Sequence, residues 1–396
     1  MGSRVPKGLL SVVVGNTPAA RGLAVDKLVC AVPRAVVLAV SVHCRDDGYP
    51  VVQRLVTGTG VPRSMSRAAT GDPVVILRQD LLAIRRTVQP RHVVLALPDE
   101  LDVLQFLVEL WRPRIGATAL GDHYAPAPVL AGIDPAAFLA ELGCVHRAAR
   151  LWGGADRTDP LTPAEIAARR VEAADGLIVP TPPDPADRRA GGVAALARHL
   201  NPSATLVHVF RQSGPGLELP PSFLRPAPYA REEWQVRLEP VTVSPSRPGT
   251  DQGVSSVQWR ARRPLHPERL ADALPTVMAG VVRSRGHLWL SSRPEAVVSW
   301  RSAGAHMELR EAGRWLEPGA ESAWRAASPQ RRTLASWFWD DHYGERGNDI
   351  TFTGAHLDRD RLCSALDAAL LHDTELALGS EGWAGYPDPL LGDLPH

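Results

Sequence analysis

The sequence predicts an α/β domain, built on a parallel sheet with helices on both faces, followed by a smaller α+β domain. Through the first half of the chain, continuous apolar runs alternate with amphipathic stretches, which is typical of parallel strands covered by helices on both faces. Toward the C-terminus, apolar and polar residues alternate within short segments, and this pattern indicates strands with one solvated face.

The expected strands of the first domain are apolar runs bounded by polar or turn-forming residues. They are Leu10–Val14, Ala35–Val42, Val74–Leu77, Val93–Leu97, Ala127–Ile133, Gly176–Val179 and Thr205–Val209. The helices expected between them are Ala19–Cys30, Asp80–Thr87, Leu101–Leu110, Pro135–Leu142, Pro163–Ala174 and Ala190–His199. Two of these helices have well-marked starts, because Asp134 and Thr162 are capping residues that each precede a proline at the first helical position.

A change of composition divides the chain. Pro, Ser, Gly and Arg crowd together from residue 212 to residue 253, as they do in linkers. Beyond this segment, VQWRARR (257–263) alternates as a strand does, and DRDRLCSALDAALL (358–371) is an amphipathic helix with an aspartate cap. Strands with helices on one face favour a ferredoxin-like α+β sandwich. The predicted division is a first domain 1–212, a Pro/Ser-rich linker 213–253, a second domain 254–385 and a tail 386–396.

Composition excludes several classes of protein. The chain has 396 residues with 44 basic and 43 acidic side chains, so net charge provides no general attraction to nucleic acid or membrane. The four cysteines are scattered without a CxxC pair, which argues against a disulfide framework and a zinc ribbon. No segment has the pattern of a signal peptide, and no apolar stretch reaches the length of a transmembrane helix. We therefore expect a soluble cytoplasmic protein that binds neither DNA nor a membrane.

The stretch SVVVGNTPAARGLAVDKLV (11–29) has the outline of a phosphate-binding turn, with a strand, a glycine, small residues and a helix. A working P-loop also needs a lysine for the β- and γ-phosphates and a Ser or Thr hydroxyl for Mg²⁺. Neither Lys7 nor Lys27 stands at the position of the P-loop lysine. The arginine in the loop does not replace a lysine that reaches the phosphates through the loop. The candidate residues of a vestigial nucleotide cleft are Gly15, Asn16, Thr17, Arg21, Gly22 and Asp184.

Several segments resemble the CobW-type family of P-loop GTPases and metal chaperones over nearly the whole chain. GVVRSRGHLWLSSRP (280–294) and DHYGERGNDITFTG (341–354) are similar to that family's C-terminal domain, in order and in spacing. GDPVVILRQDLL (71–82) resembles the segment that carries the family's Cys-x-Cys-Cys metal motif. The resemblance implies a P-loop-NTPase-like first domain and a CobW C-terminal domain, with GTP, Mg²⁺ and zinc as the family's ligands.

The departures from the family fall on its functional positions. Asp72, Val74 and Val75 stand where the family has three cysteines, and valine cannot bind a metal. The guanine-reading Asn-Lys-x-Asp is replaced by VPTPPD (179–184), so Asp184 has no lysine or asparagine to brace it. These changes together predict loss of GTPase function. We expect no cofactor, with GTP–Mg²⁺ and zinc binding only if the altered motifs retain weak affinity.

Metal-binding and catalytic patterns are weak elsewhere. His43 and Cys44 lie at the end of an expected strand, where alternation points them to opposite faces. With Asp72, they are the weak candidates for metal ligands, and the prediction is that there is no metal site. The sequence has no GxSxG motif, and no cysteine has the helical or basic surroundings that activate a thiol as a nucleophile. No catalytic residue is therefore predicted.

The second domain is rich in arginine and tryptophan. This combination suits RNA phosphates and bases, suits a protein interface equally well, and also fits a solvated sheet face with tryptophans in the core. Alternation places Arg283 and Arg285 on one face of their strand. The residues predicted to contact a partner are Arg260, Arg262, Arg263, His266, Arg283, Arg285 and Trp289.

Three features resemble a degenerate actinobacterial subgroup of the family. They are the turn without a lysine, the prolines at the guanine-reading position, and the segment WLSSRPEAVVSWRSAGAHMEL (289–309). That subgroup recruits a ribosome hibernation factor when zinc is scarce. The resemblance implies a non-catalytic pseudo-GTPase adaptor whose partners are the hibernation factor and the ribosome, with contact to rRNA through arginines. Two alternatives stay open: a GTP-binding zinc chaperone with weak residual nucleotide binding, and a scaffold for another metalloprotein client.

Overall fold

The chain forms two compact units, residues 1–235 and residues 236–396. The computed structural model describes residues 6–44, 50–99, 101–146, 161–181, 188–209, 219–242, 245–318, 321–383 and 385–392. The first unit is an α/β layer structure and the second an α+β sandwich, so the predicted fold class is confirmed. No helix within these ranges has the length and apolar character needed to cross a membrane.

The first unit is built on an eight-stranded sheet in the order β4-β3-β2-β5-β1-β6-β7-β8. Its parallel strands are β1 (Gly8–Gly15), β2 (Val36–Cys44), β5 (His92–Ala96), β6 (Tyr124–Gly132), β7 (Gly176–Pro180) and β8 (Thr205–Val209). The hairpin of β3 (Pro50–Thr57) and β4 (Arg67–Thr70) extends it antiparallel to β2. Because β1 lies in the middle, the turn that follows it opens at the centre of the sheet's carboxyl edge.

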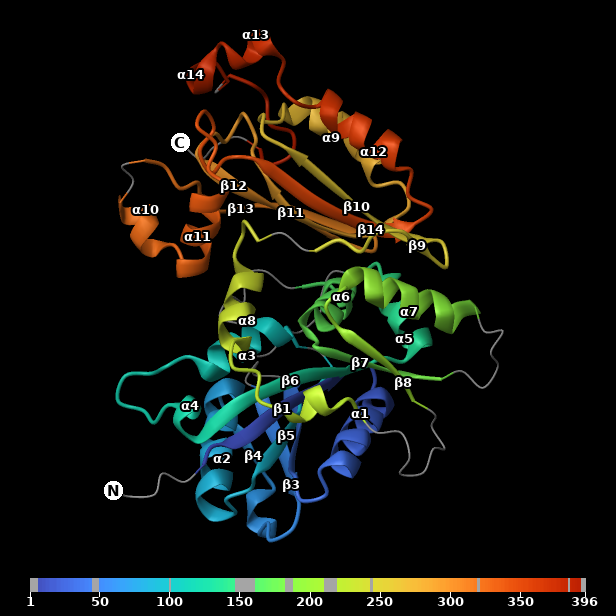
Figure 1. Ribbon diagram of the computed structural model, residues 1–396, viewed down its shortest axis with the longest axis vertical. Helices are drawn as coiled ribbons and strands as arrows, with labels where there is room; N and C mark the ends of the chain where they lie inside the picture. Colours follow the sequence, from blue (N-terminus) through green and yellow to red (C-terminus); the bar gives the residue numbers. More distant parts are fainter. Residues whose placement is uncertain are drawn as a thin grey trace. The chain divides into compact units, whose positions relative to one another are not determined.

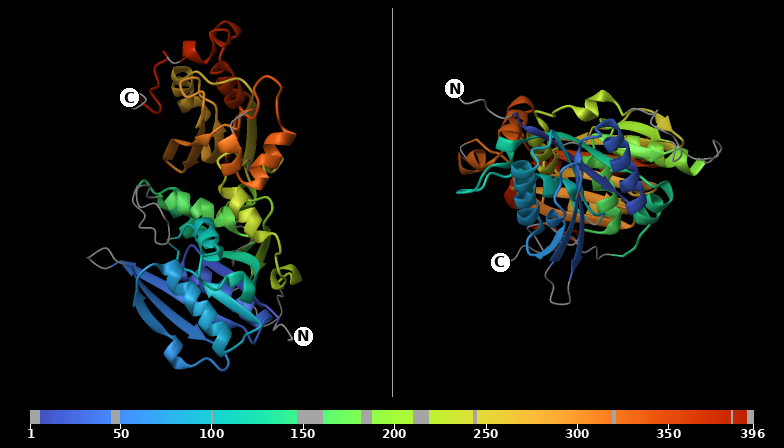
Figure 2. Two further views of the ribbon diagram at one scale, coloured as in Figure 1. Left: turned by 90° about the vertical axis from the view of Figure 1, so that its left-hand side faces the viewer. Right: turned by 90° about the horizontal axis from the view of Figure 1, so that it is seen from below.

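Helices cover both faces of this sheet. Helix α1 (Pro18–Ala31) contacts β1, β5, β6 and β7, and α2 (Pro73–Thr87) flanks the strands on the opposite side in the right-hand view of Figure 2. The other helices are α3 (Val103–Trp111), α4 (Leu120–His123), α5 (Pro135–Leu142), α6 (Pro163–Ala173) and α7 (Arg188–Leu200). Helices α5 and α6 begin at the predicted caps, since Asp134 and Thr162 accept backbone N–H groups of the first turn.

Two local predictions for the first unit were wrong. The segment Val74–Leu77, expected to be a strand, is the first turn of α2, because Asp72 caps the helix and Pro73 occupies its first position. The hairpin strand β3 was missed because one of its inward positions carries Arg54. That arginine is 5% exposed, and its guanidinium lies 2.9 Å from the Asp80 carboxylate, so a charge occupies a place where an apolar residue was expected.

The segment predicted as a linker contains ordered structure, and the division between the units falls inside it, after Gln235. A 3₁₀ turn, η2 (Pro221–Leu224), brings Leu219 and Phe223 into the core cluster around Val13 and Leu28. Helix α8 (Ala230–Leu238) follows, and its Trp234 lies against Trp111 with ring centroids 6.4 Å apart. A short strand, β9 (Thr250–Asp251), comes next.

The second unit is a six-stranded antiparallel sheet in the order β13-β12-β11-β14-β10-β9. Its long strands are β10 (Val254–Ala261), β11 (Val281–Leu288), β12 (Ala296–Ala303), β13 (His306–Arg314) and β14 (Asn348–Ala355). Helices α9 (Pro267–Val277) and α12 (Arg359–Ala368) lie side by side on one face (Figure 1). The remaining helices are α10 (Glu321–Ala326), α11 (Pro329–Trp337), α13 (Asp373–Leu376) and α14 (Gly379–Trp383).

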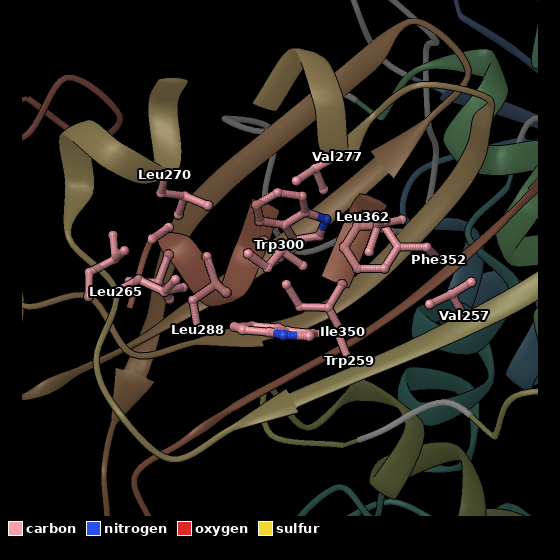
Figure 3. Packing of buried hydrophobic residues seen from close by; sticks show 14 residues of the cluster. Val257, Trp259, Leu265, Leu270, Val277, Leu288, Trp300, Ile350, Phe352 and Leu362 are labelled. Carbon is pink, nitrogen blue, oxygen red and sulfur yellow. The ribbon is translucent and has the colours of Figure 1, made fainter. Parts of the chain in front are cut away.

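The core of the second unit lies between the sheet and the helices α9 and α12. Figure 3 shows Trp300 and Phe352 from the sheet together with Val277 of α9 and Leu362 of α12. The Trp300 indole donates to the Ser284 hydroxyl at 2.7 Å, so its only polar atom is satisfied. The described part of the predicted tail, up to residue 392, also packs on this unit, since Asp388 is 9% exposed and bonds to Ser292 at 2.7 Å.

Candidate functional site

The turn between β1 and α1 is shorter than a phosphate-binding loop. Strand β1 ends at Gly15 and α1 begins at Pro18, so only Asn16 and Thr17 join them. The Thr17 side chain accepts the Ala20 N–H at 3.0 Å, and its carbonyl accepts the next N–H. The first turn of α1 is therefore capped by the chain itself rather than left open to an anion.

The side chains of Asn16 in this turn and Arg21 in α1 also make internal hydrogen bonds. The Asn16 amide donates to the Asp134 carbonyl at 2.9 Å and accepts the Asp134 N–H at 2.7 Å, which ties the turn to the start of α5. The Arg21 guanidinium donates to the Leu97 carbonyl at 2.8 Å, beyond the end of β5. Asn16 and Arg21 of the predicted cleft therefore bond to the backbone that follows β6 and β5.

A buried ion pair stands beside this turn. Arg170 of α6 is 2% exposed, reaches the Glu141 carboxylate of α5 at 3.1 Å and donates to the Asp99 carbonyl at 2.5 Å. Burial raises the pKa of Glu141, and the nearby Arg170 charge partly offsets that rise. Arg170 therefore joins α6 to α5 and to the segment that follows β5.

The second unit contains a cavity of about 550 Å³ that no sequence pattern indicated. Its walls come from separate parts of the chain: the end of α8 and the segment after it, the end of β10, β11, α11 and the start of β14. Its polar lining includes Arg260, Arg262, His287 and Asp349, and its apolar lining includes Leu334 and Phe338. We call it the His287 cavity.

His287 is the buried polar group of this cavity. Its side chain is 8% exposed, and it meets the Trp315 ring edge-on at a centroid distance of 5.8 Å. Burial, reinforced by the charges of Arg331, Arg260 and Arg262, lowers the His287 pKa to about 4. The imidazole is therefore neutral at physiological pH and has one donor and one acceptor nitrogen.

Three of the residues predicted to contact a partner are exposed and already paired within the unit. Arg260 lies 2.5 Å from the Asp349 carboxylate, and Arg263 lies 2.7 Å from that of Asp373. Arg262 donates to two backbone carbonyls, those of Phe338 at 2.7 Å and of residue 346 at 3.1 Å. These arginines hold loops in place and still present positive charge to solvent.

Three other residues that were predicted to contact a partner are buried within the second unit. Trp289 is 4% exposed and donates to the Pro294 carbonyl, because it belongs to a second aromatic core. Arg283 is 4% exposed and donates to the Ser302 carbonyl at 3.0 Å. His266 is 9% exposed and stacks on Tyr386 with centroids 4.6 Å apart. Arg285 shares the face of Arg283, as predicted from alternation, and is half-buried opposite Arg301.

Comparisons with known proteins identify the family. The cobalamin synthesis protein cobW C-terminal domain matches residues 254–370. A zinc chaperone of Mycobacterium tuberculosis is 30% identical over 321 residues, which cover 80% of this chain and 76% of that protein. The chain belongs to the CobW family.

Two further relatives of this CobW protein are more distant. A zinc-regulated GTPase metalloprotein activator of Dictyostelium discoideum is 28% identical over 213 residues, which cover 52% of this chain and 44% of that protein. The solved structure of the Zn(II)-bound YjiA GTPase from E. coli covers 92% of this chain and 100% of its own, with 11% identity and a TM-score of 0.35.

The β1–α1 turn of this CobW protein does not fit nucleotide phosphates. Glycine serves here for close packing rather than for a ligand: a Cβ on Gly132 would lie 2.1 Å from the Ala20 carbonyl oxygen, and one on Gly15 would lie 2.5 Å from the Arg21 nitrogen. Helix α1 thus packs directly on the ends of β1 and β6. Gly22 lies within α1, and Asp184 lies outside the described residues.

The candidate metal ligands do not gather. Asp72 caps α2 by accepting the Val74 N–H at 2.8 Å. His43 is exposed on β2 and lies opposite Val51, whereas the side chain of Cys44 lies outside the described part. No group of three His, Cys, Asp or Glu side chains that could hold a metal ion occurs among the residues that the structure describes. The described residues therefore assign no zinc site.

Proposed function

We propose that this CobW protein acts in zinc homeostasis by binding a client protein, without binding GTP at the β1–α1 turn. The single observation behind this proposal is the closed turn, in which two residues connect strand to helix and both are consumed by internal hydrogen bonds. The link to zinc rests on the relatives, one named a zinc chaperone and another a zinc-regulated GTPase metalloprotein activator.

Two measurements test the proposal. A strain lacking the gene is expected to grow more slowly than its parent under zinc chelation and equally well with added zinc, and the wild-type gene is expected to restore growth. Equal growth of both strains under chelation removes the zinc role. Titration of the full chain with a fluorescent GTP analogue and Mg²⁺ is expected to show no saturable binding at micromolar concentration.

A second candidate function is a GTP-binding zinc chaperone, and the names of the relatives favour it. It requires that GTP–Mg²⁺ bind despite the missing lysine, so that nucleotide controls transfer of zinc as cargo. Zinc transfer from the purified protein to an apo-enzyme, measured with and without GTP, separates the two candidates. GTP-dependent transfer supports the chaperone, whereas equal transfer or none supports nucleotide-independent client binding.

Recruitment of a ribosome hibernation factor is a narrower form of the client-binding proposal. Its support is limited to the arginines that the second unit exposes, including Arg260, Arg262 and Arg263, and none of the relatives' names refers to a ribosome. Co-sedimentation with ribosomes at low salt, with and without the hibernation factor, tests it. Phosphate contacts predict association that weakens steeply as salt rises, and protein that stays in the supernatant at low salt excludes this form.

A further inference from the structure

The His287 cavity is a site that the proposed function leaves unused. It lies on the face of the six-stranded sheet away from α9 and α12, since Leu288 packs in the helix-covered core while its neighbour His287 lines the cavity. Its volume of about 550 Å³ is within the range of small-molecule sites in proteins. Every described residue that lines it belongs to the second unit.

The imidazole of His287 is a buried polar part of the cavity wall. It is 8% exposed, its Nδ1 is buried, and the described residues provide no hydrogen-bond partner for that atom. A buried polar atom without a partner costs about 1–3 kcal/mol, so such atoms in folded proteins are normally satisfied by water or by a ligand. Because the ring is neutral, it recognises a polar group without adding charge.

The charged groups at the cavity favour an anion. Arg260 uses its Nε for Asp349, and the described residues provide no partner for its two terminal nitrogens. Asp349 is also satisfied by the Gln258 amide at 3.0 Å. Among the described residues, the partners of Arg262 are carbonyl oxygens, and Glu345 is neutralised by Arg331 at 2.8 Å. Arg260 and Arg262 balance Asp349 and Glu345 within the lining, and Arg331 beside them brings the net charge of these five groups to +1.

The remaining walls are apolar. Leu334 and Ala335 of α11 face the cavity, with Val241 from the segment after α8. Phe338, at the end of α11, lines it as well and is 64% exposed, which is unusual for a phenylalanine side chain. A ligand that covered these groups would remove apolar surface from water.

We propose that the His287 cavity binds an organic carboxylate with an apolar body. The carboxylate bonds to the terminal nitrogens of Arg260, the apolar body contacts Leu334 and Phe338, and the His287 imidazole accepts or donates a hydrogen bond at the buried wall. The same chemistry occurs in a free branched-chain acid and in the C-terminal residue of a peptide. The experiment separates these two sources.

Calorimetric titration of the full chain tests the site with matched acids and amides. The small-molecule probes are 4-methylpentanoate and 4-methylpentanamide; the peptide probes are acetyl-glycyl-leucine and its C-terminal amide. We expect one-site binding of at least one acid, and at least about tenfold weaker binding of its amide, because charge-assisted hydrogen bonds are the stronger kind. Binding of both acids points to a peptide C-terminus, and binding of 4-methylpentanoate alone points to a free acid.

Variants locate the binding. Arg260→Met and Phe338→Ser change side chains that are more than half exposed, and in Arg260→Met the Gln258 amide still bonds to Asp349, so both proteins are expected to fold. Each is expected to weaken binding of the acid, Arg260→Met by about tenfold or more. The matched control is Arg359→Gln, at the exposed start of α12 and outside the cavity, which is expected to leave binding unchanged.

Three results overturn the proposal. The first is no saturable binding of either acid up to millimolar concentration. The second is equal affinity for acid and amide, which removes the carboxylate from recognition. The third is equal affinity of an acid for the wild-type chain and for Arg260→Met, because that result places the binding of the acid outside the His287 cavity.

Discussion

Replacing Asn16 with alanine tests whether the β1–α1 turn is a structural closure or a nucleotide site. Asn16 is 5% exposed, and its amide makes two hydrogen bonds to the Asp134 backbone, at 2.9 Å and 2.7 Å. Each such bond contributes about 0.5–1.5 kcal/mol, and a buried backbone group left without a partner costs about 1–3 kcal/mol. We therefore expect Asn16→Ala to lower the free energy of unfolding of the first unit by about 2–4 kcal/mol.

Calorimetric melting measures this effect. For a unit of this size, about 1 kcal/mol shifts the melting temperature by roughly 2–4 °C, so the transition of the first unit should fall by about 5–15 °C. Thr17→Ala is the matched control at the neighbouring position, because it removes only the cap of α1 and should cost about 1 kcal/mol. A loss below about 0.5 kcal/mol for Asn16→Ala would refute the structural reasoning.

Three further predictions concern other buried contacts. Gly132→Ala should melt lower than wild type by several degrees or fail to fold, because its Cβ would collide with the Ala20 carbonyl; an unchanged melting temperature would contradict this close packing. Arg331→Met should cost about 3–5 kcal/mol in urea unfolding, because it strands the buried Glu345 carboxylate, and the double variant Arg331→Met/Glu345→Leu should recover most of that loss. Burial lowers the His92 pKa to about 4 in the folded state, so as the pH is lowered the unfolded state takes up a proton at this histidine before the folded state does. The free energy of unfolding should therefore fall as the pH is lowered from 6.5 to 4, and it should fall less steeply in His92→Gln than in the wild type.

Much of the first unit follows from its sequence because its strands are buried on both faces. Strands β1 and β5 are buried along nearly their whole length, and the capped prolines mark the starts of α5 and α6. The same reasoning failed at β3, where the inward Arg54 is compatible with burial only because Asp80 lies opposite it. Such a pair joins residues from different elements, which a local pattern does not reveal.

The candidate site was predicted only in part, for the same reason. The sequence placed Gly15, Asn16 and Thr17 at a turn, but the clamp on Asp134 depends on the neighbouring strand β6. The His287 cavity joins segments from β10, β11, α11 and β14, which are distant along the chain. Arg283 and Trp289 were predicted to contact a partner, and charge and aromatic content did not reveal that both are buried, Trp289 within a second aromatic core.

Equilibrium binding of GTP to the full chain, with Mg²⁺ at low micromolar protein concentration, tests the central claim most directly. The closed β1–α1 turn predicts no saturable signal and no rise in melting temperature with GTP. Saturable micromolar binding that Arg21→Ala or Asn16→Ala abolishes, with the fold retained, would contradict the account and favour a GTP-binding zinc chaperone.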